Sequence, residues 1–135
     1  MDSGRKQLRM ADEYESIGDY ITTLLKLNLK MDKGDMELLI ETRSEIIELH
    51  ERVLKYLTMI NEAVKEDNVR ILLKAGTHGD AITHLIKEYR TNHLERVESG
   101  NITALKSLII TDMLNAYRRV KDHALNIAEV LAGEK

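Results

Sequence analysis

The feature that most constrains this chain is an absence: its 135 residues contain no proline. Proline interrupts helices because it lacks a backbone N–H and clashes with the preceding turn. The rest of the composition is rich in Leu, Ile, Glu, Lys and Arg, which suit helices, and nothing in it favours strands. We therefore expect an all-α protein. The length suffices for one domain with a substantial core, so we assign residues 1–135 to a single helical domain.

Turn-forming residues divide the chain into four helical segments. The breaks lie at residues 30–35, 65–68 and 98–103. Gly100 suits a left-handed position at a helix C-terminus, Asn101 or Thr103 suits the following N-cap, and Gly133 closes the last segment. Because short connections make neighbouring helices antiparallel, the pattern predicts an up-down-up-down four-helix bundle.

The third helical segment contains two glycines, Gly76 and Gly79. Each costs about 1 kcal/mol relative to alanine in a helix interior. Their presence is consistent with a kink, with a break into two helices, or with the close approach of another backbone. The sequence leaves these three alternatives open.

Charge and cysteine content exclude several functional classes. The net charge is −3, and no basic stripe is present, which argues against a nucleic-acid partner. The absence of cysteine removes disulfides and zinc–thiolate sites. No run of about 18 apolar residues exists, and the N-terminus lacks the apolar core of a signal peptide, so we expect a soluble chain without direct membrane insertion.

The metalloenzyme families built on four helices do not fit the histidine pattern. A ferritin-like site needs Glu-x-x-His on two helices, and none of the five histidines has Glu three residues before it. No His-x-x-x-His pair of the hemerythrin type occurs either. Because no nucleophile–base pair or phosphate-cradling glycine loop was found, we expect no enzyme activity and no catalytic residues.

The first and last segments each place polar residues opposite an apolar stripe. In the first segment the stripe consists of Met10, Tyr14, Ile17, Ile21 and Leu24. The polar residues are Asp12, Glu15 and Asp19 in the first segment, and Asn115, Arg118, Asp122, Asn126 and Glu129 in the last. Carboxylates one helical turn apart repel one another unless a cation such as a metal ion lies between them. A solvated helix face explains the same pattern, since every surface helix has one.

Two stretches, YESIGDYITTLLKL (14–27) and YRRVKDHALNIAEVLAG (117–133), carry a family resemblance. Both resemble the signature helix of the PhoU family of phosphate-transport regulators, which reads roughly E-R-I-G-D-H-A-x-N-I-A-E around an E/D-x-x-x-D motif. The first stretch keeps Glu15, Ile17, Gly18 and Asp19. The second keeps Asp122, His123, Ala124, Asn126, Ile127, Ala128 and Glu129.

The segment at residues 85–103 also resembles the family's penultimate helix, which ends in R-x-x-H-x-x-R-x-x-x-G. The matching residues are Arg90, His93, Arg96 and Gly100. PhoU proteins contain two three-helix repeats, each of which ends in the signature helix. Matched to them, this chain begins with the last helix of one repeat and continues through a second repeat. The arrangement is most similar to the cytosolic PhoU-like domain at the C-terminus of bacterial sodium/phosphate cotransporter-related proteins.

The resemblance implies a cytosolic regulatory or accessory domain of phosphate transport, excised from a longer protein of the inner membrane. Its partner would be the membrane transporter portion of the same parent protein, and a homodimer is a further candidate assembly. A metal-free helical interaction module, unrelated to phosphate, is the alternative that the helical periodicity also permits.

The resemblance also implies a metal site, because E/D-x-x-x-D residues of PhoU relatives ligate iron or zinc. Glu15 and Asp19 match this motif, and Asp12, Asp122 and Glu129 are further candidate ligands. In the second copy Arg118 stands where the acid is expected, and an arginine opposes a nearby cation. The resemblance leaves open the roles of four motif positions: Arg118, His123, Asn126 and His93.

Overall fold

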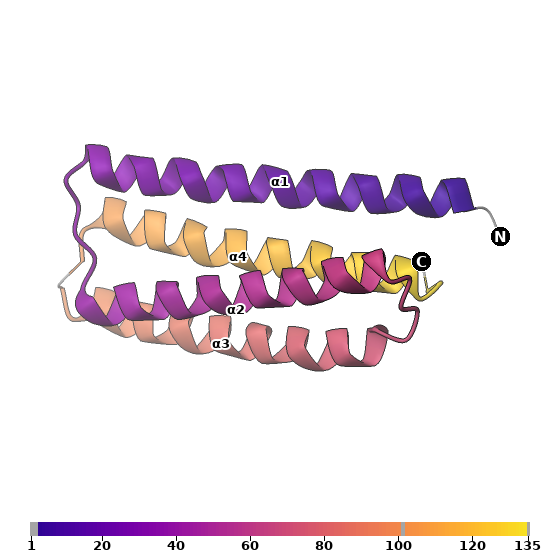
Figure 1. The fold of residues 1–135 in the computed structure, drawn as a ribbon. Coiled ribbons are helices and arrows are strands. Elements are labelled where there is room, and N and C mark those ends of the chain that lie inside the picture. Colours follow the sequence, from indigo (N-terminus) through magenta and orange to yellow (C-terminus); the bar gives the residue numbers. More distant parts are fainter. Residues whose placement is uncertain (1–2, 101, 135) are drawn as a thin grey trace.

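The computed structural model describes residues 3–100 and 102–134. This part of the chain forms four long helices: α1 (Ser3–Lys33), α2 (Ile40–Lys65), α3 (Leu72–Glu98) and α4 (Ala104–Leu131). Successive helices run in opposite directions (Figure 1), and no strand occurs among the described residues. The predicted all-α, antiparallel four-helix bundle is confirmed.

The helix ends follow the local signals in the sequence. The Thr103 hydroxyl accepts the backbone N–H three residues later at 3.2 Å, as an N-cap residue does. Asn101, the other predicted cap, lies outside the described residues. Gly100 and Gly133 have φ angles of +81° and +83°, the left-handed conformation that glycine adopts without strain. Two aspartates adopt it in the other connections: Asp35 (φ 49°) and Asp67 (φ 52°).

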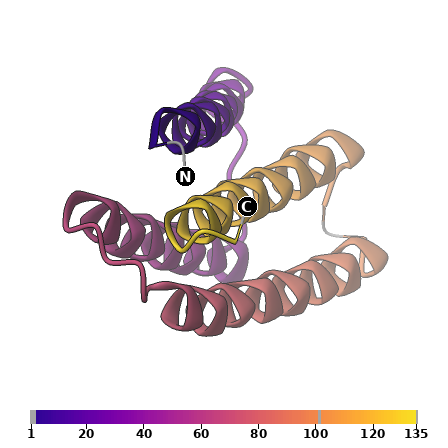
Figure 2. The same cartoon turned by 90° about the vertical axis from the view of Figure 1, so that its right-hand side faces the viewer.

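Helix α4 lies at the centre of the bundle and packs against all three other helices, as the end-on view shows (Figure 2). Thirteen of its 28 residues are buried, against six of 26 in α2 and six of 27 in α3. A helix that is covered from three sides has no fully solvated face. Some polar residues of α4 are therefore buried or half-buried, among them Lys121, His123 and Asn126, whereas Asn115 and Arg118 remain exposed.

Helix α1 packs along α4, but within the described residues its backbone does not approach α2 or α3. Its most buried residues are spaced by seven: Ile17, Leu24 and Met31. Ile21 was predicted to face the core, yet 49% of its surface is exposed because only one helix covers α1. Ile21 instead lines an apolar groove of about 350 Å³ between α1 and α2.

The two glycines of α3 lie within an unbroken helix, so the segment is not divided in two. Gly79 is buried against α2, and a Cβ atom there would lie 2.9 Å from the hydroxyl oxygen of Tyr56. That hydroxyl donates a hydrogen bond to the Ala75 carbonyl at 2.8 Å. A Cβ at Gly76 would meet nothing within 4 Å. Gly79 therefore permits a close approach, made by a side chain rather than by a backbone.

Candidate functional site

The acidic row of α1 faces solvent, as its helical spacing predicted. Asp12, Glu15 and Asp19 are all exposed. Asp12 also lines a shallow pocket with Asn126 and Val130 of α4.

The candidate metal ligands form only part of a coordination shell. Among the described residues, no group of three or more His, Cys, Asp or Glu side chains is arranged to hold a metal ion. Iron and zinc sites in proteins usually have at least three protein ligands. Glu15 and Asp19 are chemically suitable oxygen donors, but further ligands would have to come from outside this part of the chain. Metal binding at this pair stays a prediction.

The acid of the second motif, Asp122, is already paired with two cations. Its carboxylate lies 2.6 Å from the Lys121 ammonium and 3.8 Å from the Arg118 guanidinium. The Arg118 pair spans one helical turn and is solvent-exposed, so it contributes only a few tenths of a kcal/mol. The Lys121 side chain is 9% exposed, and Asp122 compensates its buried charge. Asp122 thus serves as a counter-ion within α4.

A polar junction between α1 and α4 is built around Glu13. Both oxygens of its carboxylate accept hydrogen bonds from the Asn126 amide at 3.1 Å. The His123 Nδ1–H donates to the same carboxylate at 3.2 Å, because an ionised carboxylate can only accept. The Tyr20 ring stacks on the imidazole, with ring centroids 5.8 Å apart. Two signature residues of α4, His123 and Asn126, therefore hold α1 in place.

Glu13 was not among the residues predicted from the sequence, because the predicted acids of this helix were those opposite its apolar stripe. A signal was present, since Glu13, Tyr20 and Leu27 recur every seven residues beside the buried stripe of α1. An acid in such a row faces a neighbouring helix and needs a hydrogen-bond donor there. His123 and Asn126 are those donors.

His93 of the penultimate-helix motif is a buried contact between α3 and α4. It is 2% exposed, and its Nε2 lies 2.9 Å from the Ser107 hydroxyl in the first turn of α4. Burial lowers the pKa of His93 below that of a free imidazole, so the neutral form is favoured. Arg90, three residues earlier, donates to the Asn115 side chain of α4 at 2.8 Å. Both motif residues connect α3 to α4.

Arg96, the last side chain of that motif before the glycine, connects α3 to α2. Its guanidinium makes two hydrogen bonds to the Glu45 carboxylate, at 2.7 and 2.9 Å, and a third to the Thr42 hydroxyl at 3.1 Å. Asn92 donates to the same carboxylate at 2.9 Å. The hydrogen bonds that Arg96 donates to Glu45 raise the pKa of the guanidinium further. These contacts assign the motif a structural role.

Comparison with known proteins supports the resemblance that these residues carry. The chain is similar to a PhoU homolog. This relative is the phosphate-specific transport system accessory protein PhoU homolog 1 of Thermotoga maritima, with 27% identity over 124 residues. The alignment covers 90% of this chain and 52% of the relative, so the chain spans about half the length of the curated relative it matches.

No protein-family model matches the chain, and no solved structure matches it. Within the described residues, no helix is both long enough and apolar enough to cross a membrane.

Proposed function

We propose that this chain is a PhoU-like accessory or regulatory domain of phosphate transport that acts by protein contact. The observation that carries the proposal is the similarity to a PhoU homolog over 124 residues, which includes all four helices. Two signature residues, His123 and Asn126, make the junction that positions α1, which supports a PhoU-like use of that helix.

In this proposal α1 is the helix that meets the partner. Its backbone approaches only that of α4, and it carries exposed apolar residues, including Leu8 (69% exposed) and, at the groove shared with α2, Leu25 (60%). Exposed apolar surface of this kind often marks a contact with another protein. In this proposal a movement of α1 on binding the partner is transmitted to α4 through the Glu13 junction. Because α4 contacts every other helix, the movement then reaches the whole bundle.

The partner that we propose is the membrane portion of a sodium/phosphate cotransporter-related parent protein, which would place the domain on the cytosolic side of the membrane. This proposal rests on the order of the PhoU-like segments in the sequence, one final repeat helix followed by a complete repeat, which resembles the C-terminal domain of such proteins. A second copy of the chain is the competing occupant of the same face.

Metal binding is a separate proposal. Glu15 and Asp19 would supply two oxygen ligands for iron or zinc, with the remaining ligands coming from the partner. Elemental analysis of the complex with its partner tests it, with a Glu15→Ala/Asp19→Ala variant as comparison. Metal that disappears in the variant supports the site. Metal content that is zero in both, after a challenge with added iron and zinc, refutes it.

The proposed function is tested by deleting the gene and measuring uptake of radiolabelled phosphate under phosphate-rich and phosphate-limited growth. We expect the deletion to alter uptake or its response to phosphate. Leu25→Glu should fail to restore the normal response, because it puts a charge on the exposed apolar surface of α1. Leu94→Glu is the matched control, since Leu94 is similarly exposed (56%) but lies on α3.

An unchanged phosphate response in the deletion strain would contradict the proposal. It would favour the alternative, a metal-free interaction module unrelated to phosphate. A photo-crosslinker placed at Leu25 then distinguishes the occupants, because a product of twice the chain's mass reports a homodimer. A crosslink to a protein in the membrane fraction reports the transporter.

A further inference from the structure

The cleft between α2 and α3 gathers cationic side chains that have no acidic partner. It has a volume of about 980 Å³ and lies against the first three turns of α3. Four basic side chains line it: Arg52, Lys55, Lys74 and His78. None of the four takes part in an ion pair among the described residues.

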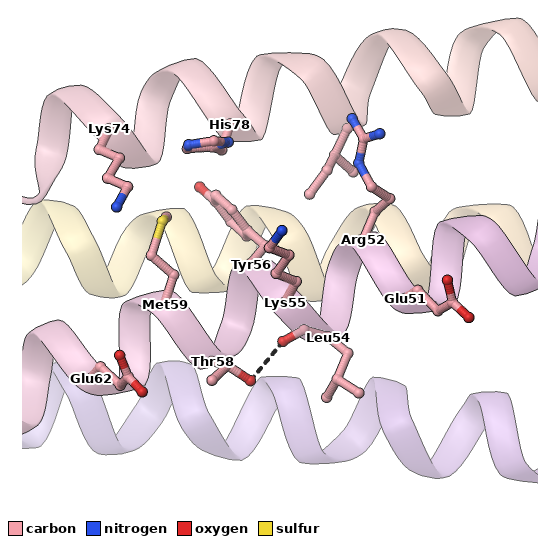
Figure 3. A pocket seen from close by; sticks show the side chains of 11 residues that line it. Glu51, Arg52, Leu54, Lys55, Tyr56, Thr58, Met59, Glu62, Lys74 and His78 are labelled. Atoms are coloured by element: carbon pink, nitrogen blue, oxygen red, sulfur yellow. Dashed lines mark hydrogen bonds between the residues drawn. The ribbon is translucent and has the colours of Figure 1, made fainter.

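The four basic side chains come from two facing rows. Arg52 and Lys55 lie almost one turn apart on α2, and Lys74 and His78 lie one turn apart on α3. In Figure 3, Arg52 extends from α2 toward α3, Lys74 extends from α3 toward α2, and His78 lies beside the hydroxyl end of the Tyr56 side chain. Basic groups of both helices therefore line the same cleft.

The sequence around these residues explains why they are unpaired. On α3, no acid lies three or four residues from either Lys74 or His78, the distances at which helical side chains pair. On α2, the acid one turn before Arg52 is Glu48, and its carboxylate instead accepts a hydrogen bond from the Tyr89 hydroxyl at 2.5 Å.

The two acids that border the cleft do not neutralise it. Glu51 and Glu62 also line it, and in Figure 3 their carboxylates lie toward opposite ends of the cleft. Glu51 stands one turn before Lys55 without forming an ion pair with it. The cleft also adjoins the N-terminal end of α3, whose first turn has no acidic residue and where the helix dipole favours an anion.

The floor of the cleft is apolar and fixed. Ile82 and Tyr56 are buried, and Met59 is half-buried beside them. Burial, followed by the charges of Glu129, Asp122 and Asp80, raises the pKa of Tyr56, so its hydroxyl stays neutral and keeps its hydrogen bond to α3. A cavity of this volume is far larger than one phosphate ion and matches the size of sites for small organic ligands.

We propose that the α2–α3 cleft is a binding site for a small phosphate-bearing anion, held by Arg52, Lys55, Lys74 and His78. The phosphate group lies among the four basic side chains, which supply charge-assisted hydrogen bonds. The rest of an organic phosphate lies over the apolar floor. The site is independent of the transport role proposed above, because it rests only on the cleft and its charges.

Calorimetric titration of the purified chain at constant ionic strength tests the proposal. The probes are inorganic phosphate, adenosine 5′-monophosphate and adenosine. We expect at least one of the two phosphate probes to bind and adenosine not to bind. Binding of inorganic phosphate alone identifies the free ion as the ligand source, whereas binding of the nucleotide identifies an organic phosphate.

The variant Arg52→Gln/Lys74→Gln should bind the phosphate probe at least about tenfold more weakly, because two charge-assisted contacts are lost. Arg43→Gln/Lys87→Gln is the matched control: it removes one cation from each of the same helices, at exposed positions outside the cleft. Circular dichroism verifies that both variants fold. The proposal is overturned if neither phosphate probe binds at millimolar concentration, if adenosine binds as well as its phosphate, or if the control loses as much affinity.

Discussion

The two glycines of α3 should respond to alanine substitution with opposite signs. Alanine favours a helix over glycine by about 1 kcal/mol when nothing else changes. Gly76 meets that condition, because a Cβ atom there has no neighbour within 4 Å. We expect Gly76→Ala to raise the free energy of unfolding by about 0.5–1 kcal/mol.

Gly79→Ala gains the same helical preference but creates a contact that the core cannot accept. Its Cβ would lie 2.9 Å from the Tyr56 hydroxyl oxygen. Tyr56 is 3% exposed and hydrogen-bonded to Ala75, so its ring cannot move into solvent without losing that bond. Overpacking costs about 1–3 kcal/mol and the hydrogen bond about 1 kcal/mol. Against the helical gain of about 1 kcal/mol, we expect a net loss of about 1–3 kcal/mol.

A second substitution identifies the cause. Tyr56→Phe removes the hydroxyl, after which the nearest ring atom lies 3.4 Å from the added Cβ. In that background Gly79→Ala should be close to neutral. The double-mutant cycle should then give a coupling of about 1–3 kcal/mol between the two positions.

Urea unfolding followed by circular dichroism at a helical wavelength measures all four proteins, and the midpoint reports stability if the slope is unchanged. The reasoning fails if Gly79→Ala is as stable as Gly76→Ala. It also fails if the deficit of Gly79→Ala persists in the Tyr56→Phe background, because the hydroxyl would then not be its cause.

Three further predictions concern the polar contacts between helices. Glu45→Ala should lower the free energy of unfolding by about 3 kcal/mol, since the carboxylate accepts three hydrogen bonds in a partly buried position. Glu62→Ala, an exposed position on the same helix, should change it by less than about 0.5 kcal/mol in the same urea titration. Burial lowers the pKa of His93 in the folded state, so the unfolded chain binds more protons between that lowered pKa and 6.5. Stability should therefore fall as the pH drops through this window. His93→Gln should flatten the fall in thermal unfolding curves recorded across it, and an equally steep fall in the variant would contradict this assignment. Glu13→Ala removes the acceptor for His123 and Asn126 and should cost about 1–2 kcal/mol. Hydrogen exchange should then accelerate in α1 before α2, and uniform acceleration would argue against a local junction.

Local features of the structure could be predicted because their causes lie within a few residues of one another. Gly100 and Gly133 end helices in the left-handed conformation, and Thr103 caps α4, as their residue types indicated. The exposure of Glu15 and Asp19 also followed from helical spacing alone. Hydrogen bonds and backbone conformations of this range depend on neighbours in the chain, so the sequence encodes them directly.

The candidate sites could be predicted only in part. Arg118 and Asp122 stand one helical turn apart in the sequence, the spacing at which opposite charges pair, and they form an ion pair at 3.8 Å. That spacing did not reveal that Lys121 also pairs with Asp122, since this depends on how deeply α4 is buried. Likewise the glycine at position 79 indicated an exceptional place in α3, but Tyr56 comes from another helix.

The sequence by itself determined four helices and the approximate positions of the breaks between them. Only the tertiary structure decided that α4 would be the central helix, that the backbone of α1 would approach α4 and no other helix, and that Glu13 would meet His123 across that contact. The same packing brought the cations of α2 and α3 to one cleft. The physical reason is the range of the forces involved: helix formation is decided by hydrogen bonds four residues apart, whereas the choice of which faces meet depends on burying apolar surface contributed by the whole chain.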